Sequence, residues 1–214
     1  MLKARYIALE GPIGVGKTSL AAQLANEFSA RSLFENVEEN PFLKEFYKNR
    51  KRNGFKTQLF FLLSRYQQQL ELIEFDLFNR VTVTDYIFAK DRIFAYLNLD
   101  EHEIALYEQV YRILDPKVPS PDLVIYLQAD LDMVLRRIKR RGYSYEKNID
   151  VDYLASVISA YNEFFFHYTE TPLLVISTSN IDFVANKGDF DELVREIKKF
   201  KSGTQYFVPL GSTP

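Results

Sequence analysis

Short apolar runs alternate with helical stretches along most of this 214-residue chain. Five runs are rich in β-branched or aromatic residues and have the length of buried strands; they lie at residues 6–9, 32–37, 81–84, 123–127 and 173–176. The helical stretches lie at residues 18–28, 56–75, 104–114, 131–141, 151–166 and 190–200. This alternation predicts an α/β fold with a five-stranded parallel sheet and helices on both faces. In such sheets, ligand-binding residues lie at the carboxyl ends of the strands.

Composition favours one folded domain and argues against several classes of protein. The chain is 47% hydrophobic and 26% charged, which suits one sizeable core. Its net charge of −2, with 27 basic and 29 acidic residues, provides no basic field for nucleic acid or an anionic membrane. The chain has no cysteine and no long apolar segment, so we expect a cytoplasmic protein without disulfides or thiolate metal sites. We expect a single domain at residues 1–201, followed by a tail at residues 202–214 that either is loose or lies over the surface.

The segment after the first expected strand has the pattern of a phosphate-binding loop, G-x-x-x-x-G-K-[ST]. It reads GPIGVGKT, from Gly11 to Thr18. Its glycines allow backbone N–H groups to face phosphate oxygens, and the helix that follows adds a partial positive charge. We expect Lys17 to contact the β and γ phosphates and the Thr18 hydroxyl to bind Mg²⁺. The residues expected to bind a nucleoside triphosphate are Gly11, Gly14, Gly16, Lys17, Thr18 and Ser19.

Two acidic residues close the second and third expected strands. Glu35 is the first acid of the stretch FENVEENPF, and Asp85 follows the run VTVT. Together with the phosphate loop, three strand ends then direct an anion-binding loop and two carboxylates into one crevice. Phosphoryl transfer to a hydroxyl uses such a set, because one carboxylate orders Mg²⁺ or its waters and the other accepts a proton. The sequence therefore favours a kinase that acts on a hydroxyl group.

A P-loop GTPase switch is the alternative from a different class. The tetrapeptide Asn186-Lys187-Gly188-Asp189 fits the N-K-x-D pattern that reads guanine. A switch also requires a D-x-x-G segment that senses the γ-phosphate, and the chain has none. The tetrapeptide also fits a turn and a helix N-terminus, with Asp189 as the N-cap or as an acid of the first turn.

Several further segments carry a family resemblance. They are GPIGVGKTSLA, ENVEENPFLKEFY, FKTQLFFLLSRY, TDYIFAKDRIFA, RIKRRGYSYEKNID and NKGDF. In this order, from Tyr6 to Phe200, the chain resembles the deoxynucleoside kinase family, and within it the bacterial deoxyguanosine and deoxyadenosine kinases. The resemblance implies a homodimer that uses ATP and Mg²⁺ to phosphorylate the 5′-hydroxyl of purine 2′-deoxynucleosides. A nucleoside monophosphate kinase of the thymidylate kinase type is the other enzyme considered; its phosphate acceptor would require extra cations in the acceptor pocket.

The resemblance also implies roles for residues of the substrate site. Glu35 corresponds to the general base, whereas Glu38 and Glu39 are expected to be loop charges. Gln58 and Arg65 are seven residues apart and therefore share one face of a helix. The implied substrate-binding residues are Tyr47 and Glu146 for the sugar, Gln58 and Asp91 for the edge of the base, Phe94 for stacking, and Arg65, Asp85 and Tyr86.

A basic segment at about residues 137–147 corresponds to the lid that closes over the phosphates. Arg137 and Arg141 lie on one helix face, at i and i+4, and match catalytic arginines of the family lid. Two tyrosines depart from the family pattern. Tyr86 stands beside the acid Asp85, and Tyr143 stands in the lid, at positions where arginine is common. The departure at Tyr86 leaves open which cation meets the 5′-oxygen.

Overall fold

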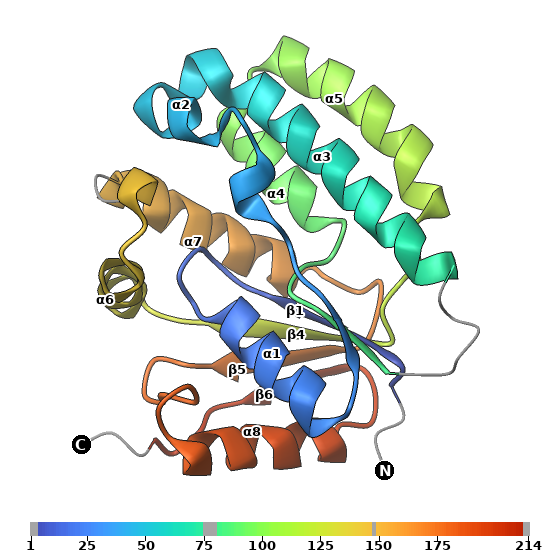
Figure 1. Cartoon of the computed structure of the whole chain (residues 1–214), viewed down its shortest axis with the longest axis vertical. Coiled ribbons are helices and arrows are strands. Elements are labelled where there is room, and N and C mark those ends of the chain that lie inside the picture. Colours follow the sequence, from blue (N-terminus) through green and yellow to red (C-terminus); the bar gives the residue numbers. More distant parts are fainter. Residues whose placement is uncertain (1–3, 75–80, 147–148, 212–214) are drawn as a thin grey trace.

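A computed structural model describes residues 4–74, 81–146 and 149–211 and contains a parallel β-sheet (Figure 1). The sheet has six strands in the order β2-β3-β1-β4-β5-β6, and every neighbouring pair is parallel. The strands are β1 (Tyr6–Glu10), β2 (Arg31–Leu33), β3 (Thr82–Thr84), β4 (Leu123–Gln128), β5 (Leu173–Ser177) and β6 (Thr204–Phe207). The expected α/β architecture is confirmed, with six strands instead of five.

The central strands are buried on both faces, which explains their continuous apolar sequences. In β4, Leu123, Ile125 and Leu127 pack into one core. Val124 and Tyr126 point to the opposite face and pack into a second core. Successive residues of a strand point to opposite sides, so an uninterrupted apolar run serves both cores.

Helices cover both faces of the sheet (Figure 1). The helices are α1 (Lys17–Glu27), α2 (Leu43–Lys48), α3 (Arg50–Glu74), α4 (Lys90–Asn98), α5 (Glu101–Leu114), α6 (Leu131–Arg141), α7 (Val151–Phe166) and α8 (Lys187–Lys199). Helices α1, α6 and α8 pack into the first core, α2 and α4 pack into the second, and α7 contributes to both. A third cluster joins α3, α4 and α5 in an outer layer. Among the helices of the described residues, none has both the length and the apolarity that a bilayer crossing requires.

The second strand is shorter than expected, because its last residues leave the sheet. Strand β2 ends at Leu33, although the expected strand extended to residue 37. The N–H of Glu35 donates to the side chain of Asp85 at 2.8 Å instead of joining the sheet. A short 3₁₀ helix, Val37–Glu39, follows. Glu35 therefore lies in a loop beyond the strand.

Two observed helices lie outside the expected helical stretches, and a third begins earlier than expected. The expected helical stretches did not include α2 or α4. Helix α3 begins at Arg50 instead of residue 56, and residue 75, its expected end, lies outside the described residues. The expected boundaries of α6 and α7 are confirmed.

The expectation of a loose segment after residue 201 is wrong for Thr204–Phe207. These residues form β6, which pairs with β5 so that Leu173 lies beside Thr204 and Ile176 beside Phe207. Most of its side chains are exposed, and the segment lacks the apolar run of a buried strand. Backbone hydrogen bonds hold this edge strand, and sequence patterns do not reveal them.

Candidate active site

The phosphate loop connects β1 to α1 and requires its glycines. Gly14 and Gly16 have positive φ values of 82° and 106°, which side chains with a β-carbon rarely adopt. A β-carbon on Gly14 would lie 2.5 Å from Ile138, and one on Gly16 would lie 2.9 Å from Phe183. The loop therefore packs closely against the start of the lid and the loop after β5.

Lys17 is folded over the phosphate loop. Its Nζ donates to the carbonyl oxygens of Gly11 and Pro12 at 2.6 and 3.1 Å. Burial and the nearby positive charge of Lys90 lower the pKa of Lys17 to about 8, although Glu10 and other carboxylates oppose this shift. The ammonium group of Lys17 therefore lies at the loop, where it can bind an anion.

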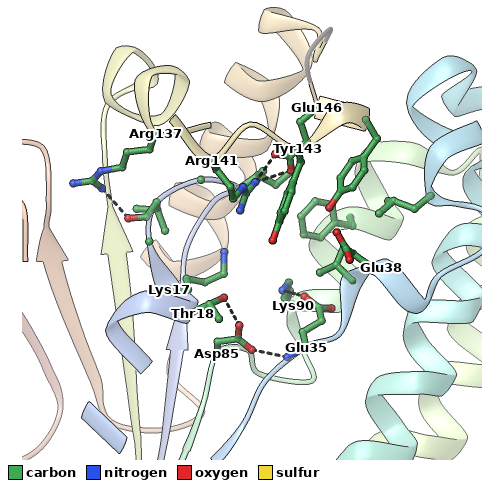
Figure 2. A pocket seen from close by; sticks show the side chains of 18 of the residues that line it. Lys17, Thr18, Glu35, Glu38, Asp85, Lys90, Arg137, Arg141, Tyr143 and Glu146 are labelled. Carbon is green, nitrogen blue, oxygen red and sulfur yellow. Dashed lines mark hydrogen bonds and ion pairs between the residues drawn. The ribbon is translucent and has the colours of Figure 1, made fainter. Parts of the chain in front are cut away.

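One cavity of about 630 Å³ lies between the phosphate loop, the Glu35 loop, helices α3 and α4, and the lid (Figure 2). Most of the site residues that the sequence predicts line it: Gly14, Gly16, Lys17, Thr18, Ser19, Glu35, Tyr47, Gln58, Arg65, Asp85, Phe94, Arg137, Arg141 and Glu146. Three others, Gly11, Tyr86 and Asp91, are buried outside its lining. Its size suits a small ligand.

Asp85 joins the phosphate loop to the Glu35 loop. Its Oδ2 accepts the hydroxyl of Thr18 at 2.5 Å, and its Oδ1 accepts the N–H of Glu35 at 2.8 Å (Figure 2). Carboxylate and hydroxyl oxygens are the hard donors that Mg²⁺ prefers, usually together with phosphate oxygens and water. Thr18 and Asp85 therefore fit a magnesium ion that accompanies a bound triphosphate.

Two cations hold the carboxylate of Glu35, which is only 11% exposed. Its Oε1 accepts from Nε of Arg65 at 2.7 Å, and the second guanidinium contact is 2.5 Å long. Its Oε2 accepts from Nζ of Lys90 at 2.7 Å (Figure 2). Burial by itself would raise the pKa of Glu35, but Arg65 and Lys90 lower it to about 2. Glu35 is therefore ionised at every pH at which an enzyme is normally assayed.

Asp91 organises the buried polar residues behind the cavity wall. Its Oδ1 accepts from Nε2 of Gln58 at 2.6 Å and from the hydroxyl of Tyr107 at 2.8 Å. Its Oδ2 is paired with the guanidinium of Arg65. Asp91 is fully buried and does not line the cavity, so the expectation that it faces the edge of the base does not match its position. It instead fixes Gln58 and Arg65, whose common helix face is confirmed.

At the lid, Arg141 and Glu146 form an ion pair beside three tyrosines. One guanidinium nitrogen of Arg141 donates to both carboxylate oxygens of Glu146, at 2.6 and 2.7 Å. Tyr145 stacks on Tyr47 with 5.9 Å between ring centroids and on Tyr143 with 5.4 Å. These rings and the ion pair form the lid side of the cavity (Figure 2).

Arg137 differs from Arg141 because its guanidinium binds backbone carbonyls. It donates to Val15 O at 2.7 Å and to the carbonyl oxygens of Thr178 and Ile181, each at 3.0 Å. Burial lowers the pKa of Arg137. In Figure 2 its side chain extends away from Lys17. The structure thus places Arg137 as a tie between the phosphate loop and the loop after β5.

The sequence patterns did not indicate Lys90, which lines the cavity, or Glu10, which is buried beside the phosphate loop. Lys90 lines the cavity and is 4% exposed; it lies inside the motif TDYIFAKDRIFA, but no periodicity marks it. Glu10 is fully buried, and its carboxylate accepts the N–H groups of Gly11 at 3.0 Å and Ile87 at 2.9 Å. Burial raises its pKa. Glu10 could have been recognised from the sequence, because it is an acid at the end of a buried strand and directly before the phosphate loop.

Tyr86 supplies no charge to the cavity. Its hydroxyl donates to Oε1 of Gln68 at 2.9 Å, and its ring is fully buried. Nζ of Lys90 lies 6.0 Å from the centroid of this ring. Tyr86 therefore packs beneath the lysine.

The segment that resembles a guanine-reading motif has a structural role. The side chain of Asn186 accepts the N–H groups of Gly188 at 2.8 Å and Asp189 at 3.4 Å, and Asn186 is the N-cap of α8. Asp189 lies in the first turn and accepts the N–H of Asp182 at 2.8 Å. The alternative reading as a turn and helix start is confirmed, with Asn186 as the cap.

A phosphate loop that faces a carboxylate across a cavity at the carboxyl ends of a parallel sheet defines a P-loop kinase. The chain belongs to the deoxynucleoside kinase family, which matches residues 7–202. The resemblance found in the sequence is thereby confirmed.

Individual relatives cover nearly the whole chain. Deoxyguanosine kinase of Bacillus subtilis (strain 168) is 36% identical over 204 residues, which is 93% of this chain and 99% of the relative. Deoxyadenosine kinase of Lactobacillus acidophilus is 32% identical over 207 residues, which is 90% of this chain and 94% of the relative. A structure of deoxyadenosine kinase from M. mycoides with bound dATP aligns with a TM-score of 0.79 at 26% identity, covering 90% of this chain and 98% of the other. Nucleotides therefore bind to solved relatives of this fold.

Proposed function

We propose that this enzyme transfers the γ-phosphoryl group of ATP to the 5′-hydroxyl of purine 2′-deoxynucleosides. The observation that carries the proposal is the position of Glu35 opposite Lys17 and Thr18 in one cavity, with Asp85 linking the two sides. The names of the relatives, deoxyguanosine kinase and deoxyadenosine kinase, support the purine substrates.

The phosphate loop forms the donor half of the proposed site. N–H groups at the start of α1 and the ammonium group of Lys17 bind the phosphates of ATP. Mg²⁺ is held by Thr18 and Asp85, and when bound it offsets the charge of the phosphates. Ser19, the second residue after Lys17, also lines this half of the cavity.

Glu35 activates the acceptor. Its carboxylate takes the proton of the 5′-hydroxyl, and the 5′-oxygen forms a bond to the γ-phosphorus as the bond to the bridging oxygen of ADP breaks. Arg65 keeps Glu35 in place through two contacts to Oε1. The other oxygen, Oε2, is then the one that meets the substrate hydroxyl.

Gln58 and Phe94 contact the base in this proposal. The two hydrogens of the Gln58 amide donate to the backbone oxygen and Oδ1 of Asp91, which leaves Gln58 Oε1 as an acceptor toward the cavity. Adenine and guanine offer amino or ring N–H donors to such an acceptor. Phe94 lines the cavity and packs edge-on against Tyr161, with 6.0 Å between centroids. Its ring is available for stacking.

The lid residues complete the site. Tyr47 and Glu146 bind the 3′-hydroxyl of the sugar, and both line the cavity. Arg141, whose side chain is 37% exposed, exchanges its contact with Glu146 for phosphate oxygens when ATP is present. Arg137 contributes through the phosphate loop that it holds.

A nucleoside monophosphate kinase fits the acceptor half less well. Its acceptor is a dianionic phosphate, which requires cations that lack protein partners. Arg65, at this end of the cavity, is already paired with both Glu35 and Asp91. The acceptor would also meet the carboxylate of Glu35, which repels a dianion. The site therefore favours an uncharged hydroxyl acceptor.

A substrate panel tests the proposed function. Labelled ATP is incubated with deoxyguanosine, deoxyadenosine, deoxycytidine, thymidine, the deoxynucleoside monophosphates and GTP, and the products are identified. We expect the two purine deoxynucleosides to have the highest kcat/KM, deoxycytidine a lower one and thymidine the lowest. The Lys17→Ala variant should remain folded and inactive. Phosphorylation of monophosphates alone, or thymidine as the best substrate, would contradict the proposal.

We also propose that the enzyme is a homodimer formed through α3 and α5. Figure 1 shows these helices side by side on the outside of the molecule. Leu63 of α3 is 47% exposed, and Leu106 and Ile113 of α5 are 50% and 63% exposed. Leu106 and Ile113 lie two helical turns apart and so belong to one apolar face. Sedimentation should give twice the mass of the chain, and a Leu106→Glu/Ile113→Glu variant should sediment as a monomer, unlike a Phe166→Glu control.

A further inference from the structure

Lys90 is a buried lysine that projects into the cavity from the first turn of α4. It is 4% exposed, and its Nζ donates to Glu35 Oε2 at 2.7 Å. A buried ammonium group is costly unless it is paired, so its position requires an explanation. Arg65 makes two contacts to Oε1 of Glu35 but is also paired with Asp91. Lys90 therefore supplies the second positive charge of this buried cluster, and it is the group that holds Oε2.

Lys90 lies between the donor half of the site, at the phosphate loop, and the acceptor half, at Glu35. Lys90 lines the same cavity as Lys17 and Thr18 of the phosphate loop. Lys90 is also the group in contact with Glu35 Oε2. A hydroxyl that gives its proton to Glu35 must approach this oxygen, since Arg65 occupies Oε1. The ammonium group thus occupies the place that the acceptor oxygen requires, next to the path of the phosphoryl group.

We propose that Lys90 is a catalytic residue that moves from Glu35 Oε2 to the transferring phosphoryl group when the acceptor hydroxyl binds. This inference rests on the proposed function. In this step Lys90 donates hydrogen bonds to phosphoryl oxygens, while the hydroxyl proton goes to Glu35 and the leaving electrons go to ADP. Its three N–H donors and flexible stem permit the exchange of partners.

The exchange also frees the oxygen that the proposed mechanism uses. While Lys90 donates to Oε2 at 2.7 Å, this oxygen already has a partner. When Lys90 moves away, Oε2 can accept the hydroxyl proton, and Arg65 still holds Oε1.

The first test compares Lys90→Met, Lys90→Arg and the control Lys44→Met, in which an exposed lysine of α2 is replaced. We expect Lys90→Met to lower kcat by roughly 100-fold or more, Lys90→Arg to recover part of the loss, and Lys44→Met to match the wild type. Thermal unfolding establishes that each variant is folded, and Lys90→Gln replaces Lys90→Met if the latter does not fold.

The second test separates contact with the phosphoryl group from support of Glu35. The affinities for a deoxynucleoside and for its 5′-monophosphate are measured by calorimetry in the wild type and in Lys90→Met. Loss of a charged hydrogen bond should weaken monophosphate binding roughly 10- to 100-fold more than nucleoside binding. Lys90→Met should also lower kcat further in a Glu35→Gln background.

The outcomes distinguish the two proposals. An unchanged ratio of the two affinities, together with no further loss in the double variant, would show that Lys90 only supports Glu35 and would overturn the inference. If the wild type phosphorylates deoxynucleosides and Lys90 only supports Glu35, the proposed function still holds. A wild type that phosphorylates no deoxynucleoside overturns both.

Discussion

The carboxylate of Asp85 accepts the backbone N–H of Glu35 at 2.8 Å, although the two residues belong to different strand ends. Its other oxygen accepts the hydroxyl of Thr18 at 2.5 Å. A single buried carboxylate thus sets the distance between the proposed base and the phosphate loop. This arrangement makes the two functions of Asp85, its charge and its hydrogen bond to Glu35, separable by substitution.

Asp85→Asn and Asp85→Ala should therefore differ. The asparagine keeps an oxygen for the N–H of Glu35 but removes the charge, so we expect kcat to fall by roughly 100-fold with little change in the KM for deoxynucleoside. The alanine removes both, and KM should rise as well, because the Glu35 loop loses its anchor. Steady-state kinetics with purine deoxynucleosides measure both effects. Identical KM values for the two variants would show that this hydrogen bond does not position Glu35.

Glu35→Gln should lower kcat by roughly 10²–10⁴-fold, the usual contribution of a general base, with a smaller change in the KM for deoxynucleoside. The control is Glu38→Gln, which changes an exposed acid at the rim of the same cavity. Thermal unfolding checks that Glu35→Gln, which leaves Arg65 and Lys90 with one anion fewer, is still folded. If Glu38→Gln is the variant that loses activity, the base has been assigned to the wrong glutamate.

ATP binding should take up a proton at alkaline pH. In the enzyme without ATP, burial and the charge of Lys90 lower the pKa of Lys17 to about 8. The carboxylates of Glu10, Asp85 and Glu35 oppose this decrease. ATP stabilises the charged form, so above this pH binding must first protonate the lysine, and affinity should fall by up to roughly tenfold per pH unit. Calorimetry between about pH 7.5 and about pH 9.5, in buffers with different ionisation enthalpies, measures the uptake. Absence of proton uptake at the alkaline end would mean that Lys17 keeps its ordinary pKa.

The two arginines of the lid should respond differently to replacement by methionine. Arg137→Met leaves three carbonyl oxygens without this donor, and a loss of about 2 kcal/mol corresponds to a fall in Tm of roughly 4–8 °C, with weaker ATP binding. Arg141→Met changes a more exposed side chain, so Tm should hardly change while kcat falls more than nucleoside affinity. Calorimetric unfolding measures Tm, and steady-state kinetics measure kcat, for both variants. A loss of Tm in Arg141→Met and a loss of kcat alone in Arg137→Met would contradict the roles given to these two arginines.

Replacement of Asp91 should alter both stability and substrate choice. Asp91→Ala leaves Gln58, Arg65 and Tyr107 without their common acceptor, which should cost about 3–5 kcal/mol of unfolding free energy. The Gln58 amide is then free to turn, so the ratio of kcat/KM between purines and thymidine should narrow. Tyr107→Phe is the matched control; it removes one hydrogen bond to Asp91 and should cost about 1 kcal/mol without changing this ratio. An unchanged ratio in Asp91→Ala would argue that Asp91 does not fix Gln58.

Periodicity and motif context predicted the parts of the site that depend on local sequence. The phosphate loop follows from its glycines and Lys17, and the common face of Gln58 and Arg65 follows from their helical spacing. Both features are encoded within a single element, so no tertiary information was needed. The same holds for the central strands, which are apolar because helices cover both faces.

Features that depend on contacts between distant segments could not be predicted. Lys90 enters the cavity only because the segment after β3 turns into α4, a helix that the sequence pattern did not indicate. Strand β2 stops early because the side chain of Asp85 captures the N–H of Glu35. Asp91 lies behind Gln58 because three donors surround it. In each case the position depends on segments that are distant in the sequence or on a helix that local patterns do not indicate.

Strand β6 has a consequence for the behaviour of the chain in solution. Without Thr204–Phe207, the outer edge of β5 would present a row of unpaired N–H and C=O groups beside the apolar sequence LLVI. Such an edge is a template for pairing with another chain, and apolar strands exposed in this way promote aggregation. The pairing of β6 with β5 satisfies the backbone groups along this apolar edge. A segment distant from the catalytic groups thereby keeps the strand LLVI from pairing with another chain.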